Sequence, residues 1–168
     1  MPSSSRRPSR LPQSLALALA VLLTVPQFAR AQDRANPYGE WRFQSADSWG
    51  TRYSPVDQIN ADNFGDLEVA WVWQANNFGP TVDYQFKSTP TYIDGILYTV
   101  AGQRRTVAAI DPATGETLWT YREPNTTRWE RSMRQNYGKG VAYGEIDGRG
   151  VIFYTSPAFF LHALDAKT

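Results

Sequence analysis

The sequence contains no cysteine, and it has no excess of either charge. Without cysteine it cannot form disulfides, thiolate metal sites, a cysteine nucleophile or a lipid anchor on a cysteine. Its 17 basic and 16 acidic residues leave a formal charge of +1. Phosphate binding needs a concentrated basic surface, so nucleic acid is not expected as a partner.

The most apolar run, residues 15–25, is only eleven residues long. A membrane-spanning helix needs roughly 20 apolar residues, so this run is too short to be a typical one. Three arginines precede it within the first ten residues, and Ala29-Arg30-Ala31 follows it. A basic start, an apolar centre and an A-x-A-like site are typical of a secretory signal peptide.

We therefore expect residues 1–31 to be removed by cleavage near Ala31-Gln32. Residues 32–168 would then form an exported, periplasmic protein. A retained membrane anchor is the alternative interpretation of the same pattern.

Aromatic residues make up 14% of the chain, and 12 glycines and 11 prolines supply turns. Aromatic residues suit half-buried pleated surfaces, so this composition predicts an all-β protein with short strands. Asp94-Gly95 is a strong hairpin signal, and residues 148–150 are expected to form another turn. A short helix is expected at 61–64 and a polar loop at 122–138. We expect strands at 68–74, 91–93, 96–100, 106–110, 116–121, 141–145, 151–155 and 161–164.

A pattern of the type Ala-x-Asp-x-x-Thr occurs twice, with Asp111 and Asp165 54 residues apart. A spacing near this value, with about four short strands in each unit, is typical of β-propeller blades of roughly 40–50 residues. A generic β-hairpin with a good turn is the alternative for either copy alone. The two copies together favour four-stranded antiparallel blades.

The repeated unit assigns structural roles to several residues. We expect small side chains where blades approach, aspartates that accept hydrogen bonds from their own turns, a turn glycine, and a flat aromatic surface for docking. These residues are, in that order, Ala109 and Ala163, Asp111 and Asp165, Gly115, and Trp119.

Several segments resemble the pyrroloquinoline-quinone (PQQ) dehydrogenases, or quinoproteins. Residues 108–119 resemble their tryptophan-docking motif, which non-catalytic propellers also carry. More specific similarities to PQQ alcohol and glucose dehydrogenases lie at 49–55, 58–60, 67–71, 86–90, 94–98 and 140–143.

The resemblance implies a propeller of about eight blades with PQQ near its axis. It implies a Ca²⁺ or lanthanide ion that bridges PQQ to the protein, and a catalytic aspartate that accepts the substrate proton. The substrate would be an alcohol or a sugar, and the electron acceptor cytochrome c or ubiquinone. This chain would hold roughly two blades, with the metal ligands and the catalytic aspartate farther downstream. Alone, it is expected to be poorly ordered and inactive.

Two positions that contact the cofactor in the family fall within the chain. Lys139 stands where an arginine often pairs with a PQQ carboxylate, so the contact would become a point charge without a bidentate fork. Lys87 stands where an acid or glutamine is common. A solvated surface lysine is the alternative for each. The absence of the family's adjacent-cysteine disulfide favours a sugar or polyol substrate, or an uncharacterised subgroup.

Other candidate features have weaker support. His162 is the only histidine, and no partner for it is evident in the sequence, so a structural role is favoured. Residues 128–134 either point toward the cofactor or form a salt-bridged surface loop. Two other functions remain open: a non-enzymatic periplasmic scaffold for outer-membrane protein assembly, and a binding propeller that has lost catalysis.

Overall fold

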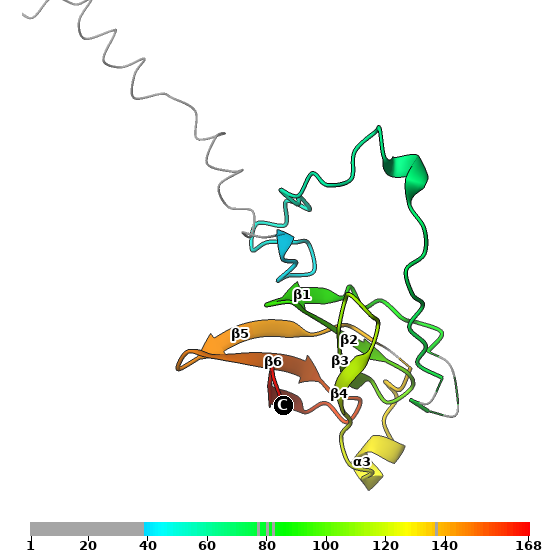
Figure 1. Cartoon of the computed structure of the whole chain (residues 1–168). Helices are drawn as coiled ribbons and strands as arrows, with labels where there is room; N and C mark the ends of the chain where they lie inside the picture. Colours follow the sequence, from blue (N-terminus) through cyan, green and yellow to red (C-terminus); the bar gives the residue numbers. More distant parts are fainter. Residues whose placement is uncertain (1–38, 77, 80, 82, 137) are drawn as a thin grey trace, which may run out of the picture. The chain divides into compact units, whose positions relative to one another are not determined.

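The computed structural model describes residues 39–76, 78–79, 81, 83–136 and 138–168, so the expected signal peptide lies outside the described residues (Figure 1). The first sheet has the order β1-β2-β3-β4 and the second the order β5-β6-β7, and neighbouring strands are antiparallel. Within this part of the chain, no helix is long and apolar enough to cross a bilayer. The strands are β1 (Thr91–Ile93), β2 (Ile96–Ala101), β3 (Thr106–Ile110), β4 (Thr117–Tyr121), β5 (Ala142–Ile146), β6 (Arg149–Thr155) and β7 (Leu161–Asp165).

The all-β prediction is confirmed, and the first sheet is the expected four-stranded antiparallel unit. The second sheet has three strands in the described structure. Both sheets are simple meanders, because each strand pairs with the next strand along the chain.

An Asp-Gly turn joins the first two strands of each sheet. Asp94 and Gly95 have φ of 50° and 79°, and Ile93 pairs directly with Ile96 across them. Two successive residues with positive φ are the requirement of a type I′ hairpin turn. The second turn lies at residues 147–148 instead of the expected 148–150, because Arg149 already pairs with Ile146.

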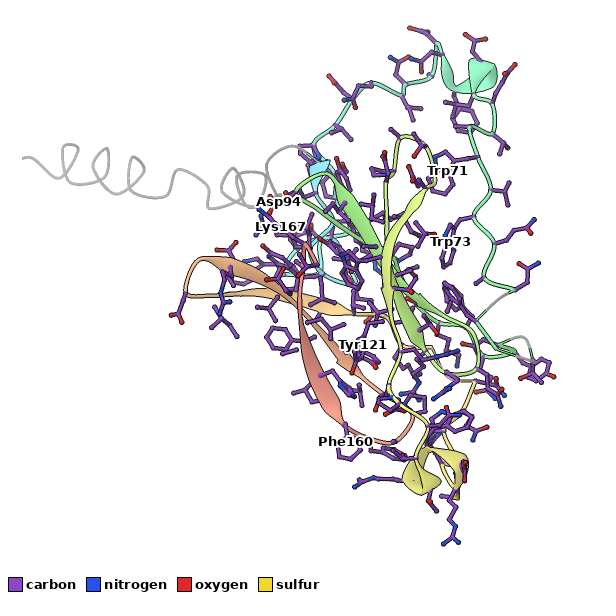
Figure 2. The ribbon with its side chains drawn as sticks, turned by 60° about the horizontal axis from the view of Figure 1, so that its bottom comes forward. Trp71, Trp73, Asp94, Tyr121, Phe160 and Lys167 are labelled. Atoms are coloured by element: carbon purple, nitrogen blue, oxygen red, sulfur yellow. The ribbon has the colours of Figure 1, made fainter. Side chains whose placement is uncertain are left out.

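The strand expected at residues 68–74 does not form. These residues have no regular secondary structure, and their indole groups attach them to the first sheet instead. Trp71 Nε1 donates to the carbonyl oxygen of Pro112, and Trp73 Nε1 donates to Thr117 Oγ1, both at 2.9 Å. Figure 2 shows both rings pointing toward the first sheet. An alternating sequence becomes a strand only where a neighbouring backbone completes its hydrogen-bond ladder.

The helical turns also differ from expectation. The 3₁₀ helix η2 (Phe64–Asp66) replaces the helix expected at 61–64, so the glycine expected to end the helix lies inside it. A short helix, α3 (Thr127–Glu130), interrupts the expected loop at 122–138. Thr126 caps its N-terminus, because the Thr126 Oγ1 accepts a 3.2 Å hydrogen bond from Trp129 N.

The core lies between the two sheets. The first sheet contributes Tyr98, Val100 and Val107, and the second contributes Ile152 and Tyr154, each no more than 2% exposed. Burial of one such side chain contributes about 1.5–3 kcal/mol. This shared core makes the two sheets one packed unit.

The repeated residues take the following positions. Asp111 Oδ1 accepts a hydrogen bond from Ala113 N and Asp165 Oδ1 one from Lys167 N, both at 2.8 Å. Trp119 is half-buried and packs against the core, and Ala109 is completely buried. Gly115 has φ +75°, and a Cβ at this position would lie 2.7 Å from the Trp71 ring. Ala163 is exposed, so no strand of the described structure covers it.

Candidate functional site: a basic cavity beside the second sheet

A cavity of about 710 Å³ opens beside β6 and the segment that leads into β5. Three basic residues, Arg105, Arg134 and Lys139, contribute to its lining. The aromatic residues Phe153 and Phe159 also line it, whereas the ring of Tyr154 lies in the core between the sheets. A planar anion would therefore meet both positive charge and flat apolar surface here.

Arg105 lies in the β2–β3 connection and is only 6% exposed. Its Nη1 donates to the carbonyl oxygens of Thr155 at 2.9 Å and Ser156 at 3.3 Å. Its Nη2 donates to the carbonyl oxygen of Arg134 at 2.8 Å. The guanidinium thus links the first sheet to the end of β6 and to the loop before β5.

The charge of Arg105 lacks a close counter-ion. Among the described residues, no carboxylate oxygen lies within 4.0 Å of it. Burial lowers the pKa of Arg105, and the more distant charges of Asp83 and Glu123 act in the opposite direction. An arginine side chain remains protonated in proteins, so the cavity wall holds a buried positive charge.

Backbone contacts hold Lys139 at the cavity. The preceding Gly138 donates its N–H to Asp83 Oδ2 at 3.0 Å and accepts a 3.1 Å hydrogen bond from Lys87 N. A Cβ at Gly138 would lie 2.9 Å from Asp83 Oδ2, and one at Gly140 3.2 Å from Ser88 Oγ. Two glycines therefore allow this segment to approach residues 83–88 closely.

The two lysines expected at the cofactor have different positions. Lys139 is exposed at the cavity and contributes to its lining. Lys87 is exposed and is not among the lining residues, although its backbone pairs with the residue before Lys139. The structure thus brings the two segments together but places only Lys139 at the cavity.

The sequence did not indicate Arg105, and it allowed two alternatives for residues 128–134. Arg134, at the end of that segment, lines the cavity, whereas the Arg128 guanidinium lies over the Phe160 ring at 4.6 Å. Its position in the connection between two expected strands is the sequence feature that could have indicated Arg105. It has φ +50°, a conformation that favours glycine.

His162 has partners that the sequence did not reveal. Its Nε2 lies 3.8 Å from Glu123 Oε2, its Nδ1 lies 3.4 Å from the Tyr121 hydroxyl, and its ring stacks on Tyr154 at 4.9 Å. Figure 2 shows Tyr121 on the side of β4 that faces the second sheet. Because Tyr154 also lines the cavity, this cluster supports the cavity wall from behind.

The described residues do not include a cluster of three or more histidine, aspartate or glutamate side chains that could hold a metal ion. The donors at the cavity are cationic and suit an anion. PQQ carries three carboxylates on a flat ring system, so the buried Arg105, the basic rim and the aromatic wall fit such a group.

Comparison with known proteins identifies the family of the chain. The quinohemoprotein alcohol dehydrogenase of Comamonas testosteroni is 38% identical over 157 residues, which are 90% of this chain and 20% of that protein. The 1-butanol dehydrogenase (cytochrome c) of Thauera butanivorans is 34% identical over 132 residues, covering 77% of this chain and 18% of the relative. The chain thus spans about a fifth of the length of these relatives.

Solved structures show the same fold. The crystal structure of the Comamonas testosteroni enzyme aligns with a TM-score of 0.57 and 31% identity over 91% of this chain and 21% of that one. A europium-containing methanol dehydrogenase aligns with a TM-score of 0.62 over 83% of this chain and 23% of that one, and at 23% identity it supports the fold alone. Residues 41–168 match the PQQ family described as the glucose/ethanol/alcohol dehydrogenase β-propeller domain, and the chain belongs to that family.

Proposed function

We propose that this chain forms part of the cofactor site of a PQQ-dependent dehydrogenase that oxidises an alcohol or sugar hydroxyl. The observation that carries the proposal is the cavity beside β6, where a buried arginine and two further cations face an aromatic wall. Family membership makes a tricarboxylate quinone the best match for that cavity.

The residues of the cavity would bind and orient the cofactor. Lys139 would attract a carboxylate as a point charge, and Phe153 and Phe159 would exclude water from one side of the flat ring. When bound, PQQ supplies the electron sink that accepts a hydride from the substrate. The protein's own contribution is placement and electrostatics.

The names of two relatives support a proposal for the electron acceptor. One is named a cytochrome c-linked 1-butanol dehydrogenase, and another, from Gluconobacter oxydans, is named a quinone-linked alcohol dehydrogenase subunit at 32% identity. We propose either cytochrome c or ubiquinone for this protein. A bound Ca²⁺ or lanthanide is proposed for the complete protein, with no ligand assigned within this chain.

Reconstitution tests the function. The complete protein should bind PQQ saturably in the presence of Ca²⁺, measured by quenching of tryptophan fluorescence, and should then reduce a dye acceptor when an alcohol or sugar is added. Lys139→Met should raise the Kd for PQQ roughly 3- to 30-fold by loss of one ionic contact. Lys167→Met is the matched control, since Lys167 is exposed and does not line this cavity. Absence of saturable PQQ binding would refute the proposal and favour the scaffold alternative.

We also propose that the chain is exported and cleaved near Ala31-Gln32. N-terminal sequencing of the mature protein from a periplasmic fraction tests this. A mature protein that begins at Met1 or remains in the membrane fraction would contradict it.

A further inference from the structure

We propose that Arg105 is the anion-binding fork of the cavity and pairs with one carboxylate of the bound quinone cofactor. This inference rests on the proposed function and assigns a residue that neither the repeat nor the family resemblance indicated. Three features of Arg105 support it: unused donors, an uncompensated charge, and a rigid anchorage.

Arg105 retains donors for a ligand. A guanidinium carries about five N–H donors, and three of those on Arg105 are used by the carbonyl oxygens of Thr155, Ser156 and Arg134. Its Nε is buried and has no partner in the described structure. The Nε of Arg104 is also buried without a partner, but of these two arginines only Arg105 lines the cavity, where a ligand could supply the missing acceptor.

The charge of Arg105 also needs a partner. Carbonyl oxygens provide hydrogen bonds but no negative charge, and burial of an uncompensated ion is unfavourable. The lowered pKa of Arg105 has this desolvation as its main cause. A ligand carboxylate in the cavity would offset the desolvation.

The anchorage fixes the guanidinium before a ligand arrives. Its three acceptors lie 29 to 51 positions away along the sequence, at the end of β6 and in the loop before β5. A group that is already held loses less entropy on binding. The backbone of Arg105 has φ +50°, which costs roughly 1–2 kcal/mol for a side chain other than glycine.

Arg105 and Lys139 have complementary roles in this arrangement. Lys139 provides charge without directional pairing, whereas a guanidinium can donate two parallel hydrogen bonds to one carboxylate. Arg105, in the β2–β3 connection, thus supplies the bidentate pairing that Lys139 cannot make.

Arg104 is a natural control for Arg105. It is the adjacent residue and is similarly buried, at 8% exposed. Its guanidinium lies over the Trp129 ring at 4.3 Å and donates to the carbonyl oxygen of Glu123 at 2.9 Å. It does not line the cavity. Loss of Arg104 would therefore reduce packing and charge without affecting a cavity ligand.

The test measures equilibrium binding of PQQ and of PQQ trimethyl ester to the complete apoprotein by fluorescence quenching. The variants are Arg105→Met, Arg105→Lys and Arg104→Met, and each is checked for its unfolding midpoint. Arg105→Met should weaken PQQ binding roughly 10- to 100-fold, because a charged hydrogen-bonded pair is lost. Arg105→Lys should lie between wild type and Arg105→Met. Arg104→Met should change the unfolding midpoint but leave the Kd within about threefold.

Binding of the ester distinguishes loss of carboxylate recognition from a general loss of folding. If Arg105 pairs with a carboxylate, Arg105→Met should change the Kd of the ester much less than that of the free acid. Equal losses for acid and ester, or an unchanged Kd for the acid in a folded variant, would overturn the proposal. Failure of both Arg105 variants to fold would assign the residue to structure alone and would also overturn it. If the wild-type protein does not bind PQQ at all, the proposed function itself fails.

Discussion

The indole Nε1 of Trp119 on β4 donates a 3.2 Å hydrogen bond to the carbonyl oxygen of Ala166, just after β7. A side chain of one sheet thereby satisfies the backbone of the next, and the ring packs against the core that both sheets share. The repeated sequence pattern had assigned this docking role to Trp119.

Removal of the Trp119 ring should loosen the junction between the sheets. Trp119→Ala should lower the free energy of unfolding by about 2–4 kcal/mol through loss of packing, and Trp119→Phe by about 1 kcal/mol through loss of the hydrogen bond. Urea unfolding of the complete protein measures both changes. Leu118→Ala is the control, since Leu118 is the adjacent residue and is 49% exposed. Losses in Trp119→Ala no larger than those of the control would exclude a docking role.

Deprotonation of Tyr98 at alkaline pH should lower the free energy of unfolding. Its hydroxyl donates to the same Ala166 carbonyl at 2.9 Å, and burial raises its pKa to about 12, with smaller contributions from Tyr143, Asp94 and Asp165. An unfolded tyrosine has a pKa of about 10. The raised folded pKa means that this contribution is complete below pH 10 and is lost as the pH rises toward 12.

Unfolding free energies measured from pH 8 to 12 test this expectation. Tyr98→Phe should be less stable than wild type by about 1 kcal/mol at pH 8, but its stability should fall less steeply with pH. Burial also raises the pKa of Tyr154, so part of the alkaline loss should remain. Tyr84→Phe, at an exposed position, should follow the wild-type curve. Parallel curves for Tyr98→Phe and wild type would contradict the assignment.

The features that were predictable from sequence are local. Asp94-Gly95 fixes a hairpin by its own backbone preference, and Asp111 closes its turn on the N–H of Ala113, two residues later. The features that were missed depend on distant partners. The anchorage of Arg105 requires a carbonyl oxygen 50 residues away. Residues 68–74 alternate as a strand should, yet no single sequence shows whether a ladder partner will be adjacent.

The partners of His162 were also not predictable from the sequence, because they too are distant along the chain. On β7 its ring stacks on the buried Tyr154, and its partner Glu123 follows β4 in the other sheet. Only the packing of the two sheets brings the carboxylate within 3.8 Å of the imidazole. The sequence alone therefore could not show the environment of the histidine.

Glu123 should be important for the junction of the two sheets because its carboxylate is buried. Its Oε1 accepts the N–H of Ala158 at 3.1 Å, and Ala158 is fully buried. Glu123→Ala leaves that N–H without a partner and should cost about 1–3 kcal/mol, whereas the amide oxygen in Glu123→Gln can still accept the bond. Thermal and urea unfolding should rank wild type above Gln and Gln above Ala. Glu116→Ala, at an exposed site, should change little. Equal losses in the Gln and Ala variants would instead assign the effect to the charge beside His162.

Substitution of Gly115 tests how the segment around Trp71 is attached to the first sheet. A Cβ at Gly115 would lie 2.7 Å from the Trp71 ring, and the residue has φ +75°. Gly148 has a similar φ of +72° but no atom within 4 Å of its Cβ position. Both alanine variants should lose about 1 kcal/mol from the backbone alone. Gly115→Ala should lose about 1–2 kcal/mol more, because the indole that binds Pro112 must move.

Comparison of Gly115→Ala with Gly148→Ala by urea unfolding isolates the ring contact from the backbone term. Limited proteolysis adds a local readout: residues 53–70 should be cut faster in Gly115→Ala only, since displacement of Trp71 frees that segment from the first sheet. Addition of Trp71→Phe to Gly115→Ala should cost less than Trp71→Phe alone, because the smaller ring accommodates the new methyl group. Equal stability losses and equal cleavage in the two alanine variants would show that the indole does not attach this segment to the sheet.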